Sequence, residues 1–179
     1  MDRIAKIIGY LVTVHVLGLL AMSVCRLVLL FANIPAEGID WSLTGRAMLI
    51  GVKFDNLIGC YIAALPCIVL PVLSLCFTFK DALYERVMRK ALTVTSWYFG
   101  VLYSLTIFIE VANARYFHFF ENHLNIGVTE WFGFVGDTAG MLFGDTVNLL
   151  FLGIAAVLIA VYILALRAIH KEYINNKIQ

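Results

Sequence analysis

The sequence predicts an all-α polytopic membrane protein, a helical bundle with four spanning helices plus short interfacial helices in the outer loop. Of its 179 residues, 62% are hydrophobic and only 14% are charged. A soluble domain is nearer half apolar and about a quarter charged, and a body this small has too little interior to hide so much apolar surface. Four apolar stretches are long enough to cross roughly 30 Å of hydrocarbon. The alternating ten-residue strands of a membrane β-barrel are missing from the sequence.

The whole chain, 1–179, is predicted to form a single transmembrane domain. The first apolar run is too long for a signal-peptide core and has no small-residue cleavage site, so we expect it to stay as a membrane helix. A loop rich in turn-forming residues, 33–45, follows it. Pro66 and Pro71 predict a kink in the second span. The four spans are expected at about 7–31, 54–79, 91–113 and 147–166.

The segment before the last span, 114–146, is too apolar for a free loop, but its apolar runs are too short to cross a bilayer. It therefore predicts short helices that lie in the membrane interface. Trp131, Phe132 and Phe134 are expected at the depth of the lipid head groups, where aromatic side chains are enriched.

The distribution of Lys and Arg predicts how the spans are oriented. Positive residues gather at the N-terminus, between the second and third spans, and at the C-terminus: Arg3, Lys6, Lys80, Arg86, Arg89, Lys90, Arg167, Lys171 and Lys177. The other two loops are acidic and poor in cations. The positive-inside rule therefore places both termini in the cytoplasm. The formal net charge of +1 excludes a broad basic field for nucleic acid.

Six polar side chains from three spans are expected at one depth, near the outer interface: Arg26, Lys53, Asp55, Glu110, Asn113 and Arg115. One interpretation is structural, with snorkelling ends and ion pairs such as Arg26 with Asp55 or Glu110. The other is a pocket for a phospholipid head group. Arginine can grip a phosphate through two hydrogen bonds, and the carboxylates can orient the cations or accept hydrogen bonds from a glycerol hydroxyl or an amine.

Other polar residues favour structural interpretations. His15 lies alone in the first span, without the titratable neighbours of a proton relay, so we expect a hydrogen-bonded packing residue. His118, Glu121 and His123 follow the spacing H-x-x-E-x-H, which does not set two histidines on one helical face. The sequence therefore predicts no metal ligands.

The four cysteines, Cys25, Cys60, Cys67 and Cys76, fall inside apolar stretches and are expected to be small buried hydrophobes without disulfides. No nucleophile elbow, phosphate-binding glycine loop or metal knuckle is present. The sequence thus predicts no catalytic residues on this chain.

Three stretches resemble one protein family. The stretch 108–127 resembles the end of the third membrane helix in lipoteichoic-acid-synthase-like proteins, which show the pattern N-x-x-Y-F-x-F-F. The matching positions are Asn113, Tyr116, Phe117, Phe119 and Phe120. R-L-V-L-L-F at Arg26 and the stretch 53–66 resemble the outer end of helix one and the start of helix two in bacterial members.

The resemblance implies a bacterial cell-envelope enzyme of the alkaline phosphatase (sulfatase-like) superfamily in the cytoplasmic membrane. Such enzymes move phosphoglycerol, or in relatives phosphoethanolamine, from a membrane phospholipid to a glycan or glycolipid. They have five membrane helices and then an outer domain with a threonine nucleophile and a manganese ion.

This chain has four spans and ends at Gln179 without that domain. We therefore expect a membrane-anchoring, lipid-binding fragment, cut before the fifth helix. Its partners would be a phospholipid and the missing catalytic domain of the same polypeptide, and manganese would lie in that domain. The alternatives are a stand-alone small transporter or channel, in which intramembrane charges line a path, and a structural partner subunit.

Overall fold

The computed structural model describes residues 2–34, 38–77, 81–123, 140 and 143–176. Within these ranges the secondary structure is helical and contains no strand. Each long helix carries a stretch that is long and apolar enough to cross a membrane. The predicted fold class, an all-α polytopic membrane bundle, is confirmed. The helices are α1 (Asp2–Ala32), α2 (Trp41–Cys76), α3 (Asp81–Phe120) and α5 (Thr146–Asn176).

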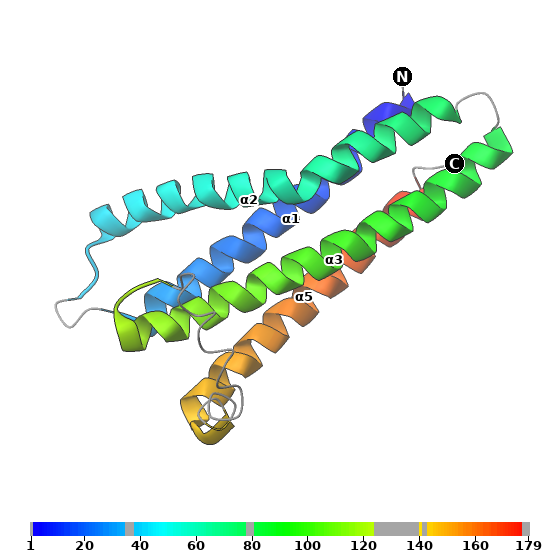
Figure 1. The fold of residues 1–179 in the computed structure, drawn as a ribbon. Coiled ribbons are helices and arrows are strands. Elements are labelled where there is room, and N and C mark those ends of the chain that lie inside the picture. The colour runs from blue at the N-terminus through cyan, green and yellow to red at the C-terminus, as the bar shows by residue number, and fades with distance from the viewer. Residues whose placement is uncertain (1, 35–37, 78–80, 124–139, 141–142, 177–179) are drawn as a thin grey trace.

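The helices α1, α3 and α5 lie side by side, with α1 and α3 parallel and α5 antiparallel to both (Figure 1). Both termini lie at one end of the bundle, which we call the termini end, together with the end of α2 and the start of α3. The opposite end, where α1 and α3 finish and α2 and α5 begin, is the distal end. The 40 residues of α3 measure about 60 Å at 1.5 Å per residue. This helix is therefore about twice as long as a bilayer core is thick.

The helices extend beyond the predicted spans. Asp40 caps the start of α2, because its side chain accepts hydrogen bonds from the backbone N–H groups of Ser42 at 2.9 Å and Leu43 at 3.1 Å. The helix thus begins inside the segment that the sequence assigned to a loop. At the other predicted boundary, α3 continues through residues 114–120. Most of the predicted interfacial segment, including its aromatic cluster at 131–134, lies outside the described residues.

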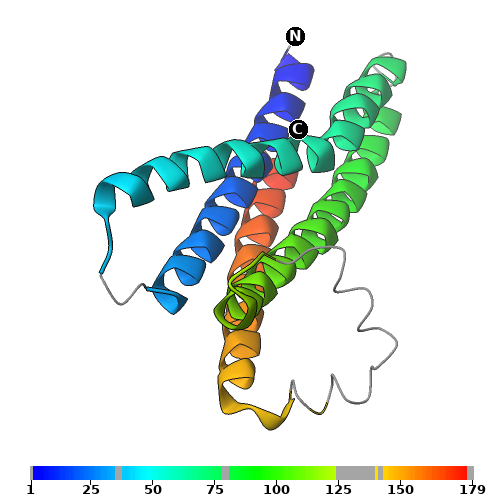
Figure 2. The ribbon, with the colours of Figure 1, turned by 60° about the vertical axis from the view of Figure 1, so that its left-hand side comes forward.

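The helix α2 is bent near its middle (Figure 2). Its N-terminal half crosses α1 at a steep angle, while its C-terminal half turns to run along α3. Pro66 is buried within the helix, and a proline there removes a hydrogen bond and pushes away the carbonyl of the preceding turn. The expected kink is therefore present. The N-terminal half leaves large apolar side chains such as Trp41 and Leu49 about 70% exposed.

The core is aromatic and tightly closed near the middle of the bundle. Tyr10, Phe99 and Tyr103 are fully buried. The Tyr103 ring lies on the backbone of α1 at Gly18, where a Cβ atom would come within 2.3 Å of two ring atoms. Apolar side chains such as Val12 and Val157 instead cover the outside of the bundle. This distribution is that of a protein surrounded by lipid.

The prediction that the cysteines are buried is correct only for Cys25. Cys60, Cys67 and Cys76 are exposed on α2, and all four thiols are free. The buried stripe of α2 is formed by other residues, among them Gly59 and Pro66. The three exposed cysteines lie on the remaining faces of the helix, where a small apolar side chain can face lipid.

Candidate functional site

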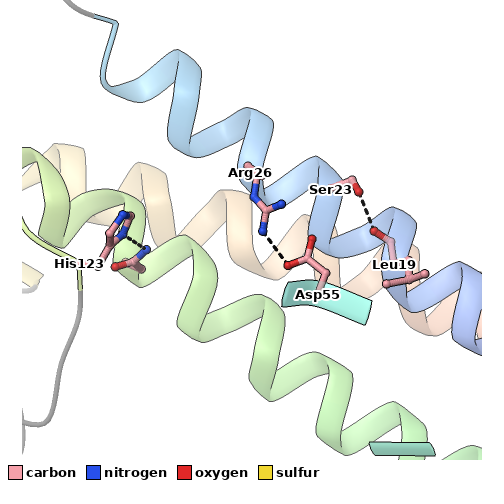
Figure 3. Close-up of polar contacts among 6 residues, drawn as sticks. Leu19, Ser23, Arg26, Asp55 and His123 are labelled. Atoms are coloured by element: carbon pink, nitrogen blue, oxygen red, sulfur yellow. Dashed lines mark hydrogen bonds and ion pairs between the residues drawn. The ribbon is translucent and has the colours of Figure 1, made fainter. Parts of the chain in front are cut away.

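An ion pair joins α1 to α2 toward the distal end (Figure 3). The Arg26 Nη2 atom lies 2.7 Å from Oδ1 of Asp55. The Asp55 side chain is 2% exposed and the Arg26 side chain 19%. One of the predicted ion pairs, Arg26 with Asp55, is therefore confirmed. The Asp55 carboxylate is buried between the helices.

The backbone of α2 accommodates the arginine at Gly51. A Cβ atom there would overlap Nη1 and Cζ of Arg26, so a larger residue at this position requires the guanidinium to move. Nη1 of Arg26 and Oδ2 of Asp55 are buried without a hydrogen-bond partner. The pair therefore retains a spare donor and a spare acceptor.

A second carboxylate, that of Glu110 on α3, lies at the same level. Two contacts between α1 and α3 show this. On one side of Arg26 and Glu110, the Tyr103 ring packs on Gly18. On the other side, the Asn33 side chain donates a hydrogen bond to the carbonyl oxygen of Ala114 at 3.2 Å. Glu110 interacts electrostatically with both members of the ion pair. We call Arg26, Asp55 and Glu110 the distal charge cluster. It brings one positive and two negative side chains together from three helices.

Lys53 does not join this cluster. It is exposed, whereas Asp55 is buried against α1. Two residues along an α-helix correspond to a rotation of about 200°, so the two side chains lie on nearly opposite faces of α2. The predicted common depth is compatible with this arrangement, but Lys53 lies on the exposed face of α2, away from the face that packs on α1.

Arg115 ties the end of α3 to the start of α5. Its Nε donates to Oδ1 of Asn148 at 2.6 Å, and its Nη2 lies 2.6 Å from Oδ2 of Asp145. Asp145 also accepts a hydrogen bond from the backbone N–H of Val147 at 2.9 Å. This backbone donor, together with Arg115, holds the pKa of Asp145 below its ordinary value. Arg115 therefore connects two helices at a place separate from the distal charge cluster.

Asn113 and His123 form a further separate contact (Figure 3). Nδ2 of Asn113 lies 3.1 Å from Nδ1 of His123, and the imidazole ring lies 5.1 Å from the ring of Phe117. Across the described parts of the chain, no three His, Cys, Asp or Glu side chains are grouped so that they could hold a metal ion.

His15 has the predicted structural role, because its Nε2 lies 2.9 Å from Oδ1 of Asn56 on α2. The sequence interpretation missed its other neighbours. A Cβ atom at Gly59 would lie 3.0 Å from Nδ1 of His15 and 3.2 Å from the Tyr103 hydroxyl, and both of these atoms are buried without a hydrogen-bond partner. The Tyr103 ring lies 5.5 Å from that of Tyr162. In the sequence, Gly59 follows Asn56 by about one helical turn on the second span. A glycine at this distance from a polar residue is the signal that could have indicated the contact of α2 with His15 and Tyr103.

The groups of the distal charge cluster are suited to binding. A guanidinium and two carboxylates offer donors and acceptors, and their formal charges sum to minus one. A net charge near lipid is stabilised by a counter-charge or by contact with water. Comparisons with protein family models, curated proteins and solved structures find no match.

Proposed function

We propose that this chain is the membrane portion of a cell-envelope phosphoglycerol or phosphoethanolamine transferase, and that the distal charge cluster holds the head group of the donor phospholipid. The proposal joins the resemblance to lipoteichoic-acid-synthase-like proteins with one observation. Three charged side chains from three helices, Arg26, Asp55 and Glu110, lie at one level and interact electrostatically, where the N-terminal half of α2 crosses α1.

The exposure of the cluster supports a lipid ligand. Arg26 and Glu110 are both partly exposed, so a head group can reach them from outside the bundle. The neighbouring half of α2 presents exposed apolar side chains, including Leu49, Ile50 and Phe54, that suit acyl chains. With the cationic termini end in the cytoplasm, as the positive-inside rule expects, the cluster faces the outer leaflet.

Lipid retention measured by native mass spectrometry tests the proposal. The double variant R26Q/D55N neutralises the ion pair with side chains of similar shape, and therefore leaves no unpaired buried charge. The matched control is R89Q/E85Q, which removes an exposed pair with a distance of 3.2 Å near the start of α3. We expect R26Q/D55N to lose retained phospholipid and R89Q/E85Q to keep it. Equal occupancy in the two variants, with helicity unchanged, would refute the proposal.

A small transporter is the second candidate, favoured by the polar groups deeper in the bundle. His15 and Tyr103 each bury a polar atom that has no hydrogen-bond partner. Flux into liposomes that disappears in both H15F and E110Q would favour this candidate over the transferase. Solute flux no greater than that into liposomes without the protein would refute the transporter candidate.

A further inference from the structure

We infer that the head group at the distal charge cluster carries a primary ammonium group, as phosphoethanolamine does, and that the Glu110 carboxylate receives it. The inference rests on the proposed function and selects among the donor lipids that the function leaves open. It follows from the balance of charge at the cluster. Arg26 is committed to Asp55 at 2.7 Å, so Glu110 is the charge left over.

Within the described part of the chain, Glu110 has no cation of its own. Among the described residues, none makes a hydrogen bond or an ion pair with its carboxylate. The nearby groups with which it interacts electrostatically are Asp55, Cys25 and the already paired Arg26. Arg115 is bound to Asp145 and Asn148 on the side of α5.

The two candidate head groups differ in what they bring to this site. A phosphoglycerol head group has a negative phosphate and uncharged hydroxyls, so it adds an anion to a cluster that already has an excess negative charge. A phosphoethanolamine head group is zwitterionic. Its ammonium group can donate to Glu110, while its phosphate can accept from the Arg26 guanidinium, whose Nη1 has no hydrogen-bond partner and whose side chain is 19% exposed. Both charges of this head group then have a partner, and the formal charge of cluster and ligand together stays at minus one, whereas phosphoglycerol would bring it to minus two.

The size of the expected preference follows from the hydrogen bond that only one lipid can make. A charge-assisted hydrogen bond that forms in one complex and not in the other corresponds to a preference of about tenfold. This preference should depend on the charge of Glu110, because glutamine keeps the shape of the side chain but loses the anion.

The test places the full chain in nanodiscs that contain equal amounts of phosphatidylethanolamine and phosphatidylglycerol with the same acyl chains, and identifies retained lipid by native mass spectrometry. We expect the wild-type chain to retain phosphatidylethanolamine in about tenfold excess. E110Q should bring the ratio toward one while lipid is still retained. The control E85Q removes an exposed carboxylate on the same helix and should leave the preference unchanged.

The outcomes separate the two proposals. Lipid retained by the wild-type chain without a preference, or a preference unchanged by E110Q, overturns the ammonium inference and leaves the lipid-holding role standing. Retention of both lipids by the wild type no greater than by R26Q/D55N overturns the lipid-holding role, and the inference with it.

Discussion

Substitution of Gly51 by alanine tests how the distal charge cluster is built. The new Cβ atom would lie 1.6 Å from Nη1, 2.1 Å from Cζ and 2.6 Å from Nε of Arg26. These atoms belong to one rigid guanidinium plane, so the group has to move as a whole. Because Nη2 of this group lies 2.7 Å from Oδ1 of Asp55, we expect the displacement to break the ion pair.

The cost of Gly51→Ala can be estimated from the burial of the two partners. Breaking a fully buried ion pair costs about 3–5 kcal/mol, chiefly because one charge is left unpaired. Arg26 is 19% exposed and can turn outward, whereas Asp55 at 2% cannot. We therefore take the lower part of the range, about 3 kcal/mol. Alanine gains up to about 1 kcal/mol over glycine within a helix. The net loss of folding free energy is about 2 kcal/mol.

Unfolding of the detergent-solubilised chain by SDS, followed by circular dichroism, measures this difference. Gly45→Ala is the matched control, because it lies on the same half of α2 and a Cβ atom there meets nothing within 4 Å. The control should be neutral or slightly stabilised. If Gly51→Ala and Gly45→Ala unfold at the same SDS fraction, the close packing of the guanidinium on α2 is refuted. A triple variant that adds R26Q/D55N to Gly51→Ala should recover most of the loss, since no buried charge then remains.

Three further predictions use the same unfolding assay. Gly18→Ala displaces the fully buried Tyr103 ring and should lower the free energy of unfolding by about 1–3 kcal/mol. The control Gly153→Ala, with open space around the new Cβ atom, should not lower it. Equal stabilities of the two variants would contradict the packing of Tyr103 on Gly18. The pair His15→Phe and Asn56→Leu should show a coupling of about 0.5–1.5 kcal/mol in a double-mutant cycle, and additive effects would exclude their hydrogen bond. Asp145 has a lowered pKa, so the stability it provides is present above the unfolded pKa of the carboxyl and is lost as pH falls through the lower, folded value. Asp145→Asn should thus remove part of the loss of stability below about pH 4, and an identical pH profile would contradict this.

The sequence predicted the features of this molecule that depend on distance along one helix. Four long apolar windows specify four crossings, because the bilayer fixes the length that a helix needs. The same rise per residue placed Arg26 and Asp55 at one depth, and they form an ion pair. Pro66 predicted the bend in α2, since its effect on the helix is local.

The sequence pattern could not predict which face of a helix points into the bundle, or which residues of neighbouring helices come into contact. Lys53 and Asp55 share a depth, but only the packing of α2 on α1 decides which of them faces the bundle. Three of the four cysteines lie on the outside for the same reason. Arg115 binds Asp145 across the long segment between α3 and α5, and no periodicity in one chain reports such a contact.

The deeper polar groups bear on the choice between lipid binding and transport. The sequence favoured lipid contact because the charges gather at one depth, yet the fold also places His15, Tyr103 and Tyr162 in the interior. A solute path needs a continuous opening, however, and the bundle is closed at this level. The Tyr103 ring lies directly on Gly18 and closes the space between α1 and α3 at this level. At this level the aromatic ring of Tyr103 holds α1 and α3 together by packing closely over a small residue. At the distal charge cluster, the Glu110 carboxylate has no ion-pair partner among the described residues, and a lipid that approaches from outside can reach this partly exposed side chain without opening the bundle.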